Sequence, residues 1–364
     1  MRIENQEVIV KFKAFIDSIT DESSVTVFHD TDMDGMTSGV LVKKGLGALG
    51  VEAKKLQPFS HTLKREITPN FLEILGDTTH LIVCDLAFES FPGIELLSEI
   101  KVLVIDHHPI RGKLYKTLQN FTVVKPGMYQ DKYDPVKICT ANIVYNLFNE
   151  VHDMSEHDWL AALGMISDAT YDAEKGFVDA VLIKNGNKVA ENPFDTDFSR
   201  AAKYGTYGDC SGEDDADEKV FEALDTSKDY KEVIEKLQEF KPVEKEFNKL
   251  LKAFDKKKKE VEDIIFYELR SKYTLNSPLA TTIGLRRIPS NKTLFVVQEK
   301  EGLMKMSVRR QDMKVHVGDM IRECIKGFED ANGGGHRPAG GARVLKKDYE
   351  EFKKRVLEWH KVDG

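Results

Sequence analysis

Two short apolar runs limit most strongly what this chain can fold into. Residues 80–84 and 102–105 are almost entirely aliphatic, which is typical of parallel strands that are covered on both faces. A β-rich run at residues 24–28 precedes them. Helical periodicity is found at residues 36–49, 140–150 and 157–167. This alternation of strand-like and helix-like segments predicts an open, mostly parallel sheet of the α/β class.

Acids and histidines follow the ends of these predicted strands. Asp30, Asp32 and Asp34 come after the first strand, and Asp106, His107 and His108 come after residues 102–105. Open parallel sheets bind ligands beyond the carboxyl ends of their strands, so we expect the two groups to meet. Carboxylates that repel one another beside an imidazole suit manganese, magnesium, iron or zinc.

Two further acids complete the predicted metal site. Asp85 ends the run at 80–84, and Asp168 follows residues 157–167. Taken alone, either acid is more simply explained by a structural role such as capping a helix. Together with the others they offer enough ligands for two divalent ions, which could activate a water and clamp a phosphoryl group. We choose Asp85 as the bridging ligand. The predicted ligands are Asp30, Asp32, Asp34, Asp85, His107 and Asp168.

His108 is expected to act beside the ions, and a second metal contact is the alternative. It is adjacent to His107, and an extended turn would point the two rings apart. We therefore assign His108 to phosphate binding and acid catalysis, and Asp106 to orienting the histidines. The predicted catalytic residues are Asp85, Asp106 and His108. The sequence assigns no role to His29.

Two other motif matches are rejected. Residues 30–35 copy the start of a calcium-binding EF-hand loop, but the twelfth position is Leu41 instead of a glutamate, and a strand precedes it. Residues 45–50 match the dinucleotide pattern GxGxxG. That match lies at the end of a helix and not between a strand and a helix.

Charge is distributed unevenly along the chain. The net charge is −8, yet residues 281–364 hold 18 basic and 12 acidic residues, a net charge of +6, which leaves −14 on the remainder. A basic part joined to an acidic metal-binding part suits a phosphate-bearing ligand. Chance asymmetry between two surfaces remains the alternative.

The basic C-terminal part is predicted to be a compact α+β domain. The pattern favours a helix at residues 318–328, followed by a glycine loop. Strands are expected at residues 282–285, 294–297, 304–308 and 342–345.

Two groups of residues in this part could bind phosphate. A triple glycine is usually only a turn, but it also lets successive N–H groups face one anion. An arginine at a strand end can hold a phosphate with two parallel hydrogen bonds. The predicted substrate-binding residues are Ser307, Arg309, Arg310, Gly334, Gly335 and His336.

Between the two parts we expect helices. Residues 193–270 combine charged runs with apolar residues at helical spacing, and the acidic stretch 213–218 is taken by default as a mobile loop. The predicted boundaries are 1–190 for the metal-binding domain, 191–275 for the helical linker and 276–364 for the C-terminal domain.

The remaining features favour a cytoplasmic protein. No run of about 18 or more apolar residues predicts a membrane span. The first residues are polar and acidic, unlike a secretory signal. The four cysteines are scattered without any CxxC pair, as is typical of reduced thiols.

These segments together resemble the DHH phosphoesterase superfamily, in its branch with a DHHA1 C-terminal domain. The matching motifs are DxDxDG at 30–35, the lone Asp85, Asp-His-His at 106–108 and Asp168, with Ser-Val-Arg at 307–309 and Gly-Gly-Gly-His at 333–336. The resemblance implies a parallel-sheet DHH domain joined by a helical linker to a smaller α+β DHHA1 domain. It also implies hydrolysis of phosphate esters with Mn²⁺ or Mg²⁺.

Within the superfamily, DxDxDG is more similar to RecJ-like exonucleases than to the oligoribonuclease and pAp-phosphatase branch. The resemblance therefore implies 5′→3′ release of mononucleotides from single-stranded DNA or RNA, or from short oligonucleotides. A phosphodiesterase for a small nucleotide (pAp, or a cyclic or linear dinucleotide) is the first alternative. A non-catalytic nucleic-acid-binding subunit is the alternative from another class. Substrate length and a homodimeric state are left open.

Overall fold

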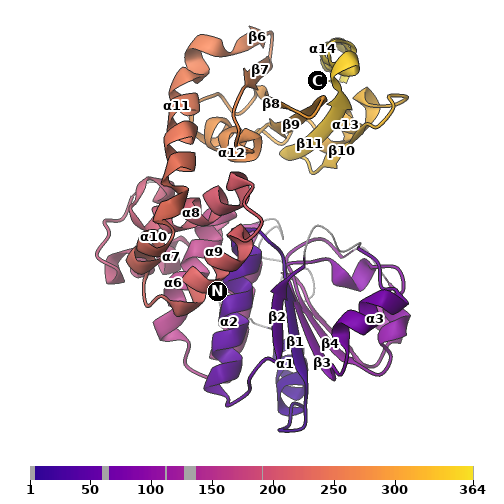
Figure 1. Cartoon of the computed structure of the whole chain (residues 1–364), viewed down its shortest axis with the longest axis vertical. Helices are drawn as coiled ribbons and strands as arrows, with labels where there is room; N and C mark the ends of the chain where they lie inside the picture. Colours follow the sequence, from indigo (N-terminus) through magenta and orange to yellow (C-terminus); the bar gives the residue numbers. More distant parts are fainter. Residues whose placement is uncertain (1–4, 60–64, 111–112, 127–136, 191, 364) are drawn as a thin grey trace. The chain divides into compact units, whose positions relative to one another are not determined.

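The computed structural model describes residues 5–59, 65–110, 113–126, 137–190 and 192–363 (Figure 1). Contacts divide the chain into two compact units. The N-terminal unit comprises Met1–Asp209 and Glu213–Glu239, and the C-terminal unit comprises Cys210–Gly212 and Phe240–Gly364. The segment predicted as a helical linker is therefore shared between the two units.

The N-terminal unit is built on a five-stranded parallel sheet, as predicted. Its strand order is β2-β1-β3-β4-β5, and every neighbouring pair is parallel. In such an order the connections change direction between β1 and β3, which is where doubly wound folds bind their ligands. The strands are β1 (Val25–His29), β2 (Lys55–Pro58), β3 (His80–Cys84), β4 (Lys101–Ile105) and β5 (Phe121–Val124).

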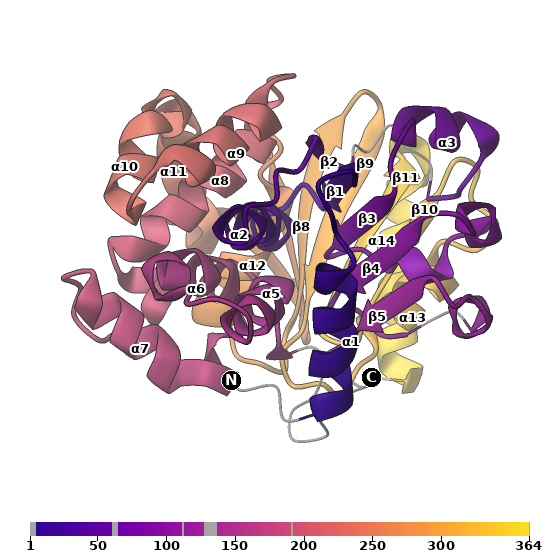
Figure 2. The same cartoon turned by 90° about the horizontal axis from the view of Figure 1, so that it is seen from below.

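Helices cover both faces of this sheet (Figure 2). On one face lie α1 (Gln6–Asp17), α2 (Met33–Ala48) and α5 (Thr140–Asn149), with α6 (Asp158–Ser167) packed on α2 and α5. The other face carries α3 (Pro69–Leu75) and three short turns, η1 (Phe88–Ser90), η2 (Ile94–Leu97) and η3 (Leu114–Thr117), over a core rich in phenylalanine. The helices predicted at 36–49, 140–150 and 157–167 are confirmed.

Further helices follow in a continuous series. The acidic stretch 213–218, taken by default as a mobile loop, leads into a helix. The amine of Lys219 forms ion pairs at 3.0–3.1 Å with the carboxylates of Glu213, Asp215 and Glu239, so two acids of this stretch have a structural partner. The segments are η5 (Ser155–His157), η6 (Tyr171–Glu174), α7 (Lys175–Lys184), η7 (Pro193–Asp195), α8 (Phe198–Ser211), α9 (Ala216–Thr226), α10 (Tyr230–Lys236), η8 (Gln238–Phe240) and α11 (Lys241–Lys257).

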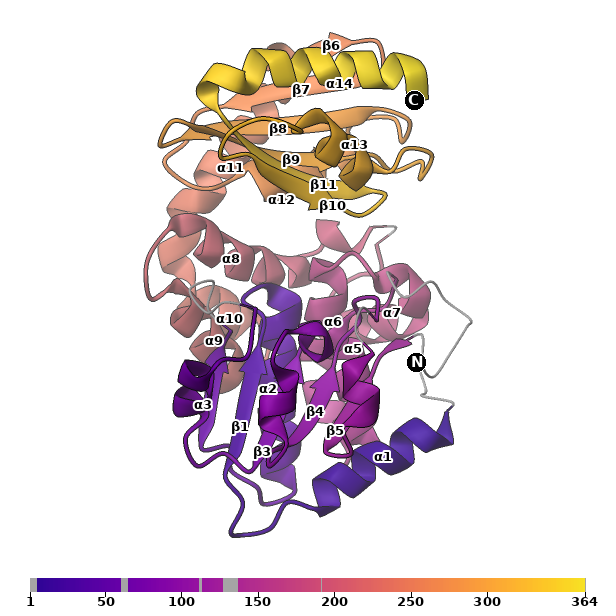
Figure 3. The same ribbon diagram turned by 90° about the vertical axis from the view of Figure 1, so that its right-hand side faces the viewer.

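The C-terminal unit holds a six-stranded mixed sheet in the order β10-β11-β9-β8-β7-β6. Only β7 and β8 are parallel. α13 (Val317–Cys324) and α14 (Tyr349–Asp363) cover one face, and α12 (Asn276–Arg286) covers β8 and β9 on the other (Figure 3). The strands are β6 (Lys259–Val261), β7 (Ile264–Leu269), β8 (Thr293–Lys300), β9 (Leu303–Arg309), β10 (Asn332–Gly335) and β11 (Ala339–Leu345), and the turn η9 spans Lys346–Asp348.

Three local predictions in this unit are wrong. Residues 282–285 are helical because β7 and β8 are parallel neighbours, which require a crossover, and α12 supplies it. β6 and β7 lie inside the segment predicted as helical. The expected glycine loop is the edge strand β10. The strands at 294–297, 304–308 and 342–345 and the helix near 318–328 are confirmed.

Among the described residues, no helix has both the length and the apolar character needed to cross a bilayer. The four cysteines are buried, and none of them forms a disulfide.

Candidate metal centre

The loop after β1 is shaped by its own carboxylates. Asp32 caps α2 by accepting a hydrogen bond from the Gly35 amide at 2.9 Å, and Asp30 accepts one from the Thr31 amide at 2.7 Å. A Cβ on Gly35 would lie 2.4 Å from the backbone oxygen of Asp30, so only glycine fits there. Asp32 and Gly35 of the DxDxDG motif therefore shape the turn that starts α2, whether or not the motif also binds a metal ion.

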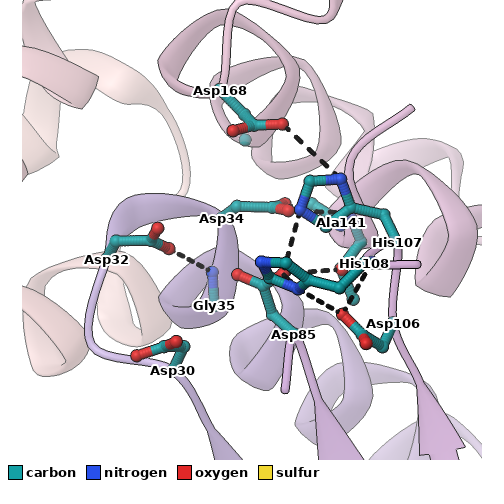
Figure 4. Close-up of polar contacts among 12 residues, drawn as sticks. Asp30, Asp32, Asp34, Gly35, Asp85, Asp106, His107, His108, Ala141 and Asp168 are labelled. Carbon is teal, nitrogen blue, oxygen red and sulfur yellow. Dashed lines mark hydrogen bonds and ion pairs between the residues drawn. The ribbon is translucent and has the colours of Figure 1, made fainter. Parts of the chain in front are cut away.

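Asp34 is fixed by the start of another helix (Figure 4). Its two carboxylate oxygens accept hydrogen bonds from the amides of Thr140 at 2.7 Å and Ala141 at 2.8 Å, at the N-terminus of α5. The helix dipole favours a negative charge at this position. Asp34 is buried, so its carboxylate is held in one orientation.

Asp85 lies at the carboxyl end of β3 in a strained backbone conformation. Its φ of 62° is in the left-handed region, which costs a residue other than glycine on the order of 1–3 kcal/mol. Thr140 donates a hydrogen bond to the carboxylate at 2.9 Å, and His107 Nε2 lies 3.4 Å from the same oxygen. The conformation aims the Asp85 side chain at the residues that follow β4.

His107 stands between the acids. Its Nδ1 lies 3.9 Å from Asp168, and within the described ranges this buried nitrogen has no hydrogen-bond partner. Two sets of three residues could each hold a metal ion, because within each set the ligand atoms lie no more than 4.8 Å apart. One set is Asp34, His107 and Asp168, and the other is Asp85, His107 and His108. A carboxylate-rich group with an unsatisfied imidazole nitrogen fits a divalent cation.

The electrostatics support the same conclusion. Burial and the charge of Asp34 raise the pKa values of Asp85 and Asp168 well above their ordinary range. Burial also lowers the pKa of His107, which favours the neutral, ligand-competent imidazole. A bound cation would relieve the repulsion between the acids, so the residues present fit the metal ions that the sequence predicts.

Asp30 and Asp32 border this cluster without joining either set. The charge of Asp32 contributes to the raised pKa values of Asp85 and Asp168, so it lies close by. One oxygen of Asp30 is 3.9 Å from the exposed guanidinium of Arg65. The structure therefore gathers four of the six predicted ligands and places the other two beside them.

His108 is held by a buried chain of charges. Its Nδ1 and its backbone amide both contact one oxygen of Asp106, at 2.7 and 3.1 Å. The other oxygen accepts a hydrogen bond from Lys125 at 2.6 Å, and Lys125 pairs with Glu89 at 2.8 Å. Burial opposes the charge of Asp106, but His108 and Lys125 hold its pKa well below the usual range. Asp106 thus orients His108 and lies outside both candidate ligand sets, whereas His108 belongs to one of them.

His29 is a packed structural side chain. Its ring stacks on Phe221 with centroids 4.9 Å apart, and its Nδ1 lies 2.7 Å from the backbone oxygen of Asp30. Burial lowers the pKa of His29 to about 4, so the ring is neutral, and a carbonyl partner requires the proton on Nδ1. It helps to hold the backbone that carries Asp30.

The predicted phosphate-binding residues lie in the C-terminal unit. Ser307 accepts a hydrogen bond from Asn276 at 2.9 Å, and the Arg309 guanidinium donates one to Thr281 at 3.0 Å. Both side chains are therefore positioned by α12. Arg309 is partly buried, and burial lowers its pKa to about 10.

Arg310 is engaged differently from Arg309. It is buried and forms two parallel hydrogen bonds to Asp312 at 2.9 and 3.0 Å, with a further contact to His360 at 3.1 Å. These contacts use most of its donors, and they account for Arg310 without a phosphate.

The glycines predicted to cradle phosphate belong to a strand. Gly334 and Gly335 pair with β11, and the φ of Gly335 is 142°, a value that L-residues rarely adopt. The amide of His336 donates to the Ala339 carbonyl at 2.8 Å, which closes the turn between β10 and β11. His336 is exposed beside this turn.

Sequence reasoning missed Lys125, Glu89 and Thr140. Lys125 directly follows the apolar strand β5, so a charged residue at the carboxyl end of a buried strand was an available signal. Glu89 lies in a short turn, where nothing local distinguishes it from a surface acid. Thr140 begins α5, and its contact with Asp85 is visible only in three dimensions.

The fold and the site together define a class of protein. It is an α/β protein with a candidate divalent-metal centre at the point where the connections of its parallel sheet change direction. Residues 24–167 match the model of the DHH family, N-terminal domain. The chain thus carries a DHH domain in these residues.

Solved structures share this fold at low sequence identity. RecJ in complex with Mn²⁺ from Thermus thermophilus has a TM-score of 0.71 and 18% identity over 99% of this chain. This chain spans only 55% of that RecJ. CDC45 from Entamoeba histolytica has a TM-score of 0.59 and 11% identity, covering 97% of this chain and 98% of that one. A pGpG-specific phosphodiesterase from Vibrio cholerae has a TM-score of 0.52 and 11% identity, covering 94% of this chain and 100% of that one. No curated protein matches the sequence.

We expect Mn²⁺ to stabilise the folded protein. A ligand that binds only the native state adds about 2.7 kcal/mol at a hundred times its Kd, and the acids here also lose their mutual repulsion. The melting temperature measured by calorimetry should rise by several degrees with Mn²⁺ and return on chelation. An unchanged melting temperature across millimolar Mn²⁺ and Mg²⁺ would contradict a metal centre.

Proposed function

We propose that the protein is a metal-dependent phosphodiesterase that hydrolyses single-stranded nucleic acid or short oligonucleotides. The observation that carries this proposal is the convergence of Asp34, Asp85, His107 and Asp168, with the oriented His108 beside them. A DHH domain in residues 24–167 supports phosphoester hydrolysis at the level of the superfamily.

The proposed ligands divide by position. His107 belongs to both candidate sets, and Asp85 belongs to one of them. Asp85 is the proposed bridge because its carboxylate lies 3.4 Å from Nε2 of His107, and Asp30 and Asp32 would complete the coordination from the rim. When bound, two divalent ions (Mn²⁺ in the proposal) supply Lewis acidity that activates a water and neutralises charge on the phosphate.

His108 contributes chemistry of its own in this proposal. Its hydrogen bond from Nδ1 to Asp106 leaves Nε2 to face the substrate. From there it stabilises the charge that develops on the phosphate and delivers a proton to the leaving oxygen. Asp106 keeps the ring in the orientation that this step requires.

The C-terminal unit supplies phosphate binding in the same proposal. Ser307 and Arg309, together with the glycine strand and His336, hold a terminal or neighbouring phosphate. The proposal includes 5′→3′ release of mononucleotides. It also includes a cytoplasmic location, which four buried cysteines without a disulfide support.

The decisive experiment follows product lengths in time. The pure protein is incubated with Mn²⁺ and 5′-labelled DNA and RNA of two, five and twenty nucleotides, beside an Asp85→Ala control. Mononucleotides from the twenty-mer are expected from the wild type alone. Tight single-strand binding without any turnover would instead support a non-catalytic binding subunit.

A phosphodiesterase for a small nucleotide is the second candidate. The fold likeness to the pGpG-specific phosphodiesterase favours it, although the identity is only 11%. In the same experiment this candidate predicts turnover that is confined to the dinucleotide. Degradation of the twenty-mer would rule it out as the sole activity.

Arg309→Ala is expected to raise KM on oligonucleotides by about tenfold, the order expected when a hydrogen bond to a charged group is lost. An artificial phosphodiester without a second phosphate should be affected much less. Lys354→Gln is the control, because it removes a positive charge from an exposed position on α14. Equal losses on both substrates would place Arg309 at the reacting phosphate.

A further inference from the structure

Two basic residues face each other across the sheet of the C-terminal unit. Lys305 on β9 and Arg343 on β11 are direct partners in the antiparallel register. Alternate residues of a strand point to one face, so Lys305 shares the face of Ser307 and Arg309. The alternate residues of β9, which are Met304, Met306 and Val308, point to the opposite face and pack in the core with α13 and α14. Lys305 is half-buried, and Arg343 is exposed.

Nothing in the described chain neutralises this pair. Neither the Lys305 nor the Arg343 side chain forms an ion pair or hydrogen bond among the described residues, although like charges directly opposite on neighbouring strands destabilise a sheet. Other cations of the C-terminal unit are paired with carboxylates, among them Lys292, Arg310, Arg322, Lys346, Lys347 and Lys353. Two uncompensated cations directly opposite each other on neighbouring strands indicate a site for an anion.

The position of the pair suggests which anion. Ser307 is paired with Gly341, two residues along both strands from Lys305 and Arg343. A step of two residues is about 6.8 Å, which is comparable to the separation of consecutive phosphates in an extended single strand. A Cβ on Gly341 would make only an ordinary contact, 3.6 Å from the backbone oxygen of Met306, so no described side chain covers this position opposite Ser307.

We propose that Lys305 and Arg343 form a second phosphate subsite, next to the one at Ser307 and Arg309. The C-terminal unit then holds two consecutive phosphates of a single strand, which favours oligonucleotides over mononucleotide-sized substrates. This inference rests on the proposed function for the nature of the substrate.

The test uses the full-length chain with Lys305→Gln and Arg343→Gln combined. Its matched control combines Lys347→Gln and Lys354→Gln, which removes the same charge from exposed positions. Binding of a labelled twelve-nucleotide DNA is measured in EDTA over a range of salt concentrations. The site variant should bind about tenfold more weakly, and its salt slope should fall by about 0.7 for one lost phosphate contact. Its stability in urea should be unchanged or higher, because a like-charge pair is removed.

Turnover in Mn²⁺ gives a second readout. The loss of kcat/KM on the twelve-mer should exceed the loss on a dinucleotide by at least about fivefold. Equal losses on both substrates, or equal weakening in the control variant, would overturn the subsite. If the wild type hydrolyses no substrate but binds the twelve-mer through this pair, the proposed function fails while the subsite stands.

Discussion

Replacing Asp85 with asparagine is expected to lower phosphodiester hydrolysis by about a thousandfold or more, the order seen when a central electrostatic group is removed from an active site. Asparagine keeps the shape of the side chain and tolerates the left-handed backbone at φ 62°. It can still accept the hydrogen bond from Thr140. What it removes is the negative charge of one candidate ligand set, 3.4 Å from His107, which belongs to both sets.

The melting temperature of the Asp85→Asn variant should respond to metal differently from that of the wild type. Without metal its melting temperature should equal or exceed that of the wild type, because one of several repelling acids is gone. The rise produced by Mn²⁺ should be small or absent. Calorimetry with and without EDTA measures both effects, and Asp319→Asn, at an exposed position on α13, is the control. Wild-type turnover in saturating Mn²⁺ would refute the bridging role of Asp85.

Replacing Lys125 with methionine is expected to destabilise the N-terminal unit by about 3–5 kcal/mol, the cost of removing one partner from a buried ion pair. Lys125, Glu89 and Asp106 are all buried, so the change leaves Glu89 without its cation and Asp106 with His108 alone. Methionine keeps most of the side-chain volume, so lost packing contributes little. Urea unfolding followed by circular dichroism measures the difference.

Two comparisons separate this effect from general damage. Lys346→Met removes an exposed lysine that pairs with Glu299, and it should cost no more than about 1 kcal/mol. Adding Glu89→Gln to Lys125→Met should recover part of the loss, because one unpaired charge is removed. A cost for Lys125→Met as small as that of the surface control would show that the buried ion pairs contribute little.

The sequence by itself was enough to predict the parallel sheet and the edge at which the acids gather. Short, fully apolar runs are typical of strands buried on both faces, and the loops after parallel strands lie at one edge. The positions of Asp85 and His107 therefore followed from their places directly after β3 and β4. The superfamily resemblance rested on the same local spacings.

Contacts between distant segments decided the rest. Whether residues 282–285 form a helix depended on β7 and β8 being parallel, and that pairing joins strands far apart in the chain. Arg309 and Arg310 are neighbours in sequence, yet one is held beside α12 and the other is paired with Asp312. In the sequence nothing near Lys125 indicates its partners, and only the folded structure shows that it is buried between Glu89 and Asp106. Periodicity reports which face of an element is buried, but the partner of a buried charge is set only when the chain has folded.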